Sequence, residues 1–108
     1  MTCDAWEIAV LPFPFSDSPQ TKRRLALVLS RKAFNAHGHT VMAMITSARH
    51  SRWPSDVAIN WAAAGLPREC VVRMKVFTID NRLLASKAGK LPRPDAARVR
   101  RSLAAIFD

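Results

Sequence analysis

Leu25-Ala-Leu-Val-Leu29 and Thr40-Val-Met-Ala-Met-Ile45 are two apolar, β-compatible runs that stand on either side of Asn35-Ala-His-Gly38. Asn and Gly tolerate the backbone angles of tight turns, so the connection has the chemistry of a hairpin. The two runs are therefore predicted to be neighbouring antiparallel strands, and the rest of the fold is expected to build on them.

Further short strands are predicted on both sides of this hairpin. Residues 5–15 read as a strand that ends in Pro12-Phe-Pro-Phe15. Because proline lacks a backbone donor, this segment is expected at a sheet edge or a strand exit. Two more strands are predicted at 57–59 and 71–78. A turn is predicted at 16–21 and a helical turn at 61–66.

The last part of the sequence is predicted to be helical. Asp80 is a suitable N-cap for a short helix over 82–87, which Gly89 closes. Pro94 suits the first turn of a terminal helix. The apolar residues that follow fall on one face of that helix, at Val99, Leu103, Ile106 and Phe107.

Length and composition indicate one small folded domain. The 108 residues form a single domain over 1–108, which excludes large cofactor folds. With 49% hydrophobic residues and a mean hydropathy of −0.02, the chain has enough apolar material for a core. The expected fold is mainly β with helices (α+β), a strongly bent small β-barrel or sheet of about five strands with helices on its rim.

The charge balance points to an anionic partner. Seventeen Lys and Arg stand against eight Asp and Glu, a formal net charge of +9, with a pI near 11.1. Because the chain also has the composition of a folded protein, the charge is interpreted as a basic surface instead of a disordered tail. Nucleic acid is the first partner to consider.

Metal, disulfide and membrane chemistry are not expected. Cys3 and Cys70 are far apart and lack companions at metal-ligand spacing, so both are interpreted as reduced thiols. The pair His37-Gly-His39 has no third ligand nearby and is read as a turn. No secretory signal or spanning segment is seen, so the protein is expected to act in the cytoplasm without cofactor, metal or membrane.

One candidate site is the run Lys22-Arg23-Arg24 directly before the strand at 25–29. Lys22 and Arg23 are predicted to contact phosphates from solvent. Arg24 stands at the strand entrance, where the backbone can aim its guanidinium for bidentate phosphate binding. An ordinary charged turn that protects a strand edge is an equal alternative from the pattern alone.

A second candidate site follows the strand at 40–45. Thr46 and Ser47 are hydroxyls at its end, and the next residues are Arg49, His50 and, beyond Arg52, Trp53. Hydroxyls at a strand end often only cap the chain. Beside cations and an aromatic ring, however, they fit single-stranded nucleic acid, whose phosphates follow the charges and whose bases stack on rings.

The chain resembles the PemK/MazF family of type II toxin-antitoxin ribonucleases. The motifs that carry the resemblance run in order through residues 6–107, as Val10-Leu-Pro-Phe-Pro-Phe-Ser-Asp17, Lys22-Arg-Arg-Leu-Ala-Leu-Val28, Met44-Ile-Thr-Ser-Ala48, Gly65-Leu66, Val71-Val-Arg73, Phe77-Thr-Ile-Asp80 and Gly89-Lys-Leu91. The resemblance implies an SH3-like barrel with a C-terminal helix, a homodimer, metal-independent cleavage of single-stranded RNA such as mRNA at short motifs, and an acidic cognate antitoxin.

Residue by residue, the family's strand-entrance arginine falls on Arg24 and its strand-end threonine on Thr46, which makes these two the predicted catalytic residues. Arg73, in the motif Val71-Val-Arg73, is added to the predicted RNA contacts. Some members have an acidic residue after this arginine, where this chain has Met74 and Lys75. A non-catalytic toxin that binds a protein such as DNA gyrase and a plain RNA-binding barrel are therefore kept as alternatives.

Overall fold

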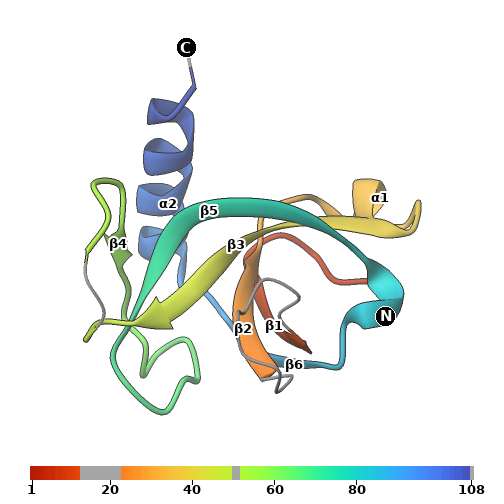
Figure 1. Ribbon diagram of the computed structural model, residues 1–108, viewed down its shortest axis with the longest axis horizontal. Coiled ribbons are helices and arrows are strands. Elements are labelled where there is room, and N and C mark those ends of the chain that lie inside the picture. The colour runs from red at the N-terminus through yellow and green to blue at the C-terminus, as the bar shows by residue number, and fades with distance from the viewer. Residues whose placement is uncertain (13–22, 50–51, 108) are drawn as a thin grey trace.

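One curled antiparallel sheet dominates the computed structural model, which describes residues 1–12, 23–49 and 52–107 (Figure 1). The strands are β1 (Glu7–Pro12), β2 (Arg23–Val28), β3 (His39–Ser47), β4 (Val57–Ala58), β5 (Cys70–Asp80) and β6 (Ser86–Lys90). The helical elements are α1 (Lys32–Asn35), the 3-10 turn η1 (Asn81–Leu83) and α2 (Arg93–Ala105). The strand order β4-β5-β3-β2-β1-β6 makes the sheet a half-barrel, and the predicted mainly β class is confirmed.

The predicted hairpin is the centre of this sheet. β2 and β3 pair antiparallel with Ala26 opposite Met44. Their connection contains α1 and then Gly38, whose φ of +112° is a conformation that glycine adopts without steric cost. Asn35 is fully buried, and its amide nitrogen donates to the carbonyl oxygen of Cys3 at 2.8 Å. This bond ties the hairpin connection to the N-terminal segment.

Side-chain alternation gives the sheet two apolar faces. One face packs against α2 and has a core that includes Ile8, Leu27, Ile45, Val72 and Val99. The other face has a second core that contains Cys3, Ala9, Leu11, Ala26, Val28, Met42, Ile79 and Leu84. Both cysteines are buried and free. Because β1, β2 and β3 contribute to both cores, their positions are fixed from two sides.

β1 takes one of the two places expected for it, a strand exit, and not the other, a sheet edge. The structure confirms the strand over Glu7–Pro12, while residues 13–15 and the turn at 16–21 lie outside the described residues. β1 pairs with β2 on one side and with β6 on the other, so the predicted edge position is wrong. Pro12 is the last residue of the strand, which agrees with a strand exit.

The predicted helix over 82–87 is also wrong. Asp80 does act as an N-cap, accepting a hydrogen bond from the Arg82 N–H at 2.9 Å, but it caps only the turn η1. Residues 86–90 then form β6, because the open edge of β1 offers a ladder of backbone partners. The sheet therefore has six described strands where about five were expected.

Gly89 is needed for close packing and not for helix termination. It lies in β6, and a Cβ atom at this position would stand 2.0 Å from the carbonyl oxygen of Ala64. Ala64 belongs to the segment 61–66, which forms hydrogen-bonded turns and no helix, with the Leu66 N–H donating to Trp61 O at 2.8 Å. The missing side chain lets this loop lie directly on β6.

The terminal helix α2 is confirmed, with Pro94 in its first turn. Val99 is buried and Leu103 is half-buried, but Ile106 and Phe107 are 42% and 66% exposed. The end of α2 projects beyond the sheet (Figure 1), which leaves the last part of the predicted apolar face uncovered. Within the described ranges, no helix is long and apolar enough to cross a membrane.

Replacing Gly89 with alanine is expected to lower the free energy of unfolding by about 2 kcal/mol or more, because the new Cβ overlaps a backbone oxygen that cannot move alone. Urea denaturation measures this loss. The control is Lys90→Ala, an exposed change in the same strand, which is expected to stay within about 0.5 kcal/mol of the wild type. Equal stabilities for the Gly89→Ala protein and the wild type would contradict the packing described.

Candidate nucleic-acid interface

A hollow of about 230 Å³ opens where β2 begins and β3 ends. Antiparallel pairing brings these two strand ends together, and the polar residues that line the hollow are Arg23, Arg24, Thr46, Ser47 and Arg68. Arg68 comes from the loop before β5, whose first residue Cys70 pairs with Ser47. Three separate segments of chain therefore supply the hydrogen-bond donors of one small cavity.

Arg24 and Thr46, the predicted catalytic residues, lie on the same face of the sheet. Ala26 pairs with Met44, and each predicted residue stands two positions from one of these partners. Side chains two positions apart in a strand point to the same face, so the guanidinium and the hydroxyl flank the same hollow. Thr46 is only 7% exposed, which restricts its hydroxyl to a narrow opening.

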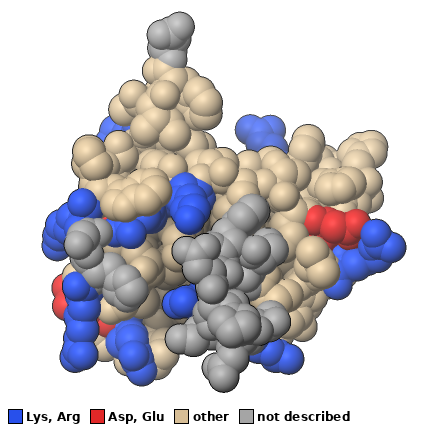
Figure 2. Space-filling model, viewed as in Figure 1, with Lys and Arg blue, Asp and Glu red and all other residues tan. Residues whose placement is uncertain are grey.

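A second hollow of about 620 Å³ continues from the first and shares Ser47, Pro67 and Arg68 with it. Arg49, Arg52 and Glu69 complete its polar lining. The two hollows together are called the basic groove below. Figure 2 shows Lys and Arg side chains gathered on the part of this face where β3 ends.

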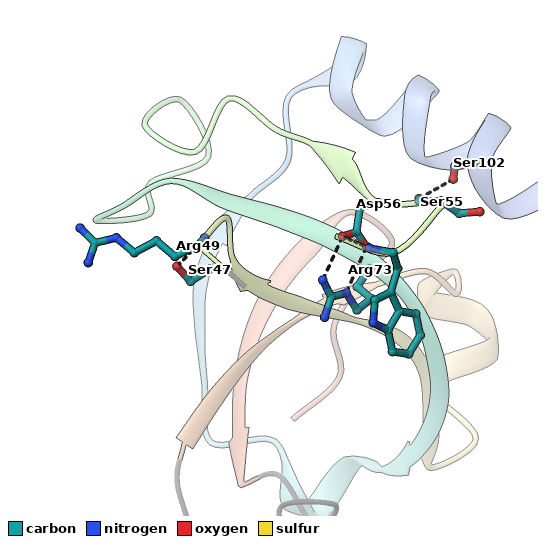
Figure 3. A network of polar contacts seen from close by, with 7 residues as sticks. Ser47, Arg49, Ser55, Asp56, Arg73 and Ser102 are labelled. Carbon is teal, nitrogen blue, oxygen red and sulfur yellow. Dashed lines mark hydrogen bonds and ion pairs between the residues drawn. The ribbon is translucent and has the colours of Figure 1, made fainter. Parts of the chain in front are cut away.

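The described lining of the basic groove carries a net positive charge, with five arginines against the carboxylate of Glu69. Among the described residues, none of its five arginines forms an ion pair. At the end of β3, the Ser47 hydroxyl accepts a hydrogen bond from the Arg49 backbone N–H at 3.3 Å, which shapes the exit of this strand (Figure 3). A groove of unpaired guanidinium groups beside two hydroxyls is suited to a phosphate chain.

Arg73 lies outside the basic groove. Its side chain is 9% exposed and forms a bidentate pair with Asp56, with Nε to Oδ1 at 3.1 Å and Nη2 to Oδ2 at 3.0 Å (Figure 3). The predicted direct RNA contact is therefore corrected: this guanidinium is buried, and its charge is balanced within the protein. It holds the loop before β4 against β5.

Trp53 belongs to that loop and is 45% exposed. The Arg73 guanidinium carbon stands 4.9 Å from the centroid of its ring, a cation-π contact. The backbone N–H of Trp53 also donates to Asp56 Oδ2 at 2.9 Å. The same loop is bound to α2, since the Ser102 hydroxyl donates to the Ser55 carbonyl oxygen at 2.9 Å (Figure 3).

The structure thus gathers part of the predicted site. Arg23, Arg24, Thr46, Ser47 and Arg49 line the basic groove, whereas Trp53 and Arg73 form a separate cluster with Asp56. Lys22 and His50 lie outside the described residues.

Sequence reasoning missed Arg68 and Glu69 as groove residues. The signal lies in the strand predicted at 71–78, because pairing of that strand with the one at 40–45 brings the loop before residue 71 to the threonine. In the described part of the chain, no three His, Cys, Asp or Glu side chains gather in a way that could hold a metal ion.

The curled sheet and its groove define a toxin fold of the MazF type. A solved MazE-MazF complex from Deinococcus radiodurans is 28% identical with a TM-score of 0.77, covering 98% of this chain and 95% of that one. MazF alone from that organism is 27% identical with a TM-score of 0.79, covering 98% and 96%. A mycobacterial endoribonuclease solved with its cognate antitoxin is 17% identical with a TM-score of 0.77, covering 95% and 92%, and supports the fold alone.

The family model for the PemK-like, MazF-like toxins of type II toxin-antitoxin systems matches residues 4–107, and the chain belongs to this family. A comparison with curated protein sequences finds no match.

The Asp56–Arg73 pair is expected to make stability depend on pH in acid. Burial by itself raises the pKa of the Asp56 carboxyl. Hydrogen bonds from the Arg73 side chain and from the backbone N–H of Trp53 outweigh burial and lower that pKa. A lowered folded-state pKa means that the stabilisation is complete above the ordinary Asp value of about 3.9 and is lost as pH falls through the folded value.

We therefore expect Asp56→Asn to be less stable than the wild type at about pH 6, with the difference shrinking below about pH 4. Urea denaturation across this pH range measures the difference in the free energy of unfolding between the two proteins. A difference that stays constant down to about pH 2 would count against the pair as the source.

Proposed function

We propose that the protein is a metal-independent, sequence-selective endoribonuclease that cleaves single-stranded mRNA, the mRNA interferase toxin of a type II system. The observation that carries the proposal is the first hollow, where Arg24 and Thr46 meet with no neutralising carboxylate among the described lining residues. Membership of the toxin family supports it. Its mycobacterial structural relative is described as an endoribonuclease.

The hollow fits transesterification of RNA. In this reaction the 2′-hydroxyl oxygen forms a bond to the adjacent phosphorus while the bond from phosphorus to the 5′-oxygen breaks. Negative charge builds on the phosphoryl oxygens, and the Arg24 guanidinium and Thr46 hydroxyl stabilise it. One product ends in a cyclic phosphate, and the other begins with a 5′-hydroxyl after the leaving oxygen takes a proton.

Arg24 acts through charge and not as a base, because a guanidinium with a pKa above about 12 keeps its proton. No carboxylate or imidazole is among the described residues that line the first hollow. Met74, where some members have an acid, packs against the core, and Lys75 is exposed. The 2′-hydroxyl proton therefore passes to water held in the groove or to His50.

The second hollow holds the neighbouring phosphates. Arg49, Arg52 and Arg68 line it, and it shares Ser47 and Arg68 with the first hollow, so a single strand can continue into it from the scissile phosphate. Arg23 contributes from the entrance of β2. Lys22 and His50 stay sequence-based predictions for the same path.

An acidic antitoxin is the proposed partner protein. The Deinococcus radiodurans relative is described as a MazE-MazF complex, and the mycobacterial one as a complex with its cognate antitoxin. A groove of unpaired arginines accepts an Asp- and Glu-rich segment as well as phosphates, so antitoxin and RNA compete for it. The site of action that follows is the cytoplasm, where mRNA is found.

Cleavage in the presence of EDTA tests the function. The wild type is expected to cut single-stranded RNA there and to leave 5′-hydroxyl ends, while Arg24→Ala lowers the rate about 10²- to 10³-fold by removing a transition-state contact. Thr46→Val tests the hydroxyl in the same assay. Arg101→Ala, an exposed arginine on α2, is the matched control and should keep the wild-type rate.

Cleavage that requires an added divalent ion would refute the metal-independent mechanism. RNA binding without any cleavage would favour a plain RNA-binding barrel. Wild-type turnover by a folded Arg24→Ala protein would remove this arginine from the mechanism.

A homodimer is the expected assembly. An apolar hollow of about 300 Å³ lies between the sheet and the end of α2, lined by Leu29, Ser30, Val41, Val76, Leu103 and Phe107. Phe107 is 66% exposed and Val76 38%, so a second copy can bury both.

Light scattering at micromolar concentration is expected to give twice the chain mass for the wild type and the chain mass for Phe107→Glu, whose charge opposes burial. Arg101→Ala is again the control. A monomeric wild type would contradict the expected assembly.

A further inference from the structure

The Trp53 ring lies on the same face of the sheet as the proposed cleavage site. Arg73, on which the ring rests, pairs with Met44 of β3, and Thr46 stands two residues further along that strand. Side chains opposite each other in an antiparallel pair share a face, as do side chains two positions apart. A strand of RNA that runs from Thr46 toward Arg73 on this face would therefore pass the ring.

The ring is held in place from behind. Asp56 binds the Arg73 guanidinium through both oxygens and also accepts the Trp53 backbone N–H, so one carboxylate fixes both partners of the cation-π contact. The Asp56 and Arg73 side chains are only 2% and 9% exposed, whereas Trp53 is 45% exposed. A buried ion pair thus supports an accessible aromatic ring.

We propose that Trp53 is a stacking platform for a nucleobase next to the cleaved phosphate, and that Asp56 and Arg73 are positioning residues that hold it. The inference rests on the proposed function and deepens it. One face of the ring is covered by the guanidinium, and the other takes the base. A ring held in this way can stack on any of the four bases, because every base has a π face.

The proposal predicts that stacking on Trp53 and contacts between arginines and phosphates have different effects on the salt dependence of RNA affinity. Arg73 is neutralised by Asp56, so the platform adds affinity without releasing counterions, whereas each groove arginine that contacts a phosphate adds about 0.7 to the slope of log affinity against log salt. A direct phosphate contact by Arg73 would behave in the opposite way, since removing Asp56 would free a cation and tighten binding.

Affinity for a fluorescent, uncleavable 2′-O-methyl oligonucleotide of mixed sequence, measured by anisotropy at several salt concentrations, distinguishes these cases. Trp53→Ala is expected to weaken binding about 5- to 150-fold with an unchanged salt slope. Trp53→Phe should restore most of the affinity, because it keeps a ring. Arg49→Ala is the matched charge control and should weaken binding with a shallower slope.

Asp56→Asn is expected to weaken binding at an unchanged slope, and the double variant with Trp53→Ala should bind no more weakly than Trp53→Ala alone, because both act through one ring. Arg73→Lys, which loses the bidentate pair, serves where Asp56→Asn fails to fold, as judged by circular dichroism. Tighter binding and a steeper slope for Asp56→Asn would overturn the positioning role.

The remaining outcomes separate this inference from the proposed function. Wild-type RNA affinity in a folded Trp53→Ala protein overturns the platform even where cleavage is intact, and a loss confined to binding of the acidic antitoxin would assign the ring to that protein instead. A wild type that neither binds nor cuts RNA overturns the proposed function, and the platform with it.

Discussion

The candidate site depends on the pairing of β3 with β2 on one side and β5 on the other. The backbone hydrogen bonds of these two pairings fix three segments that are distant in sequence in one register. A slip of one strand by one residue would turn each of its side chains to the opposite face. Because β3 ends where β2 and β5 begin, Thr46, Arg24 and Arg68 meet at one corner of the sheet. The core under α2 and the buried Asn35 keep that register from shifting.

The distribution of acids helps to explain how a net charge of +9 gathers into the basic groove. Two of the described carboxylates neutralise buried or half-buried guanidinium groups, Asp56 at Arg73 and Asp95 at Arg98. Burying an unpaired cation is costly, so these acids are needed where they stand. The groove arginines form no such ion pair among the described residues, and Glu69 is the one carboxylate in the described lining of the groove, so a net positive charge remains there.

Much of the sheet could be predicted because its strands are apolar, short and bounded by turn residues. Arg24 and Thr46 could be placed at strand ends, and pairing then brings those ends together. β6 could not be predicted, since its pattern resembles a capped helix and only the open edge of β1 decides otherwise. Arg73 was added to the RNA contacts with the motif Val71-Val-Arg73 of the family resemblance, and no local pattern identifies Asp56, seventeen residues away, as its partner.

The pairing of β1 with β6 has a consequence for the order in which the chain folds. Glu7 lies opposite Lys90, so residues from the two ends of the sequence must meet before the sheet is finished. Contacts of such long separation form late, because loop-closure entropy is lost before they give any stabilisation. On the ribosome, β1 gains its second neighbour only after residues 86–90 have emerged, and α2 covers the core only after residues 93–105 have emerged. Until then one side of β1 offers unpaired backbone groups, which are open to pairing with the strands of other chains.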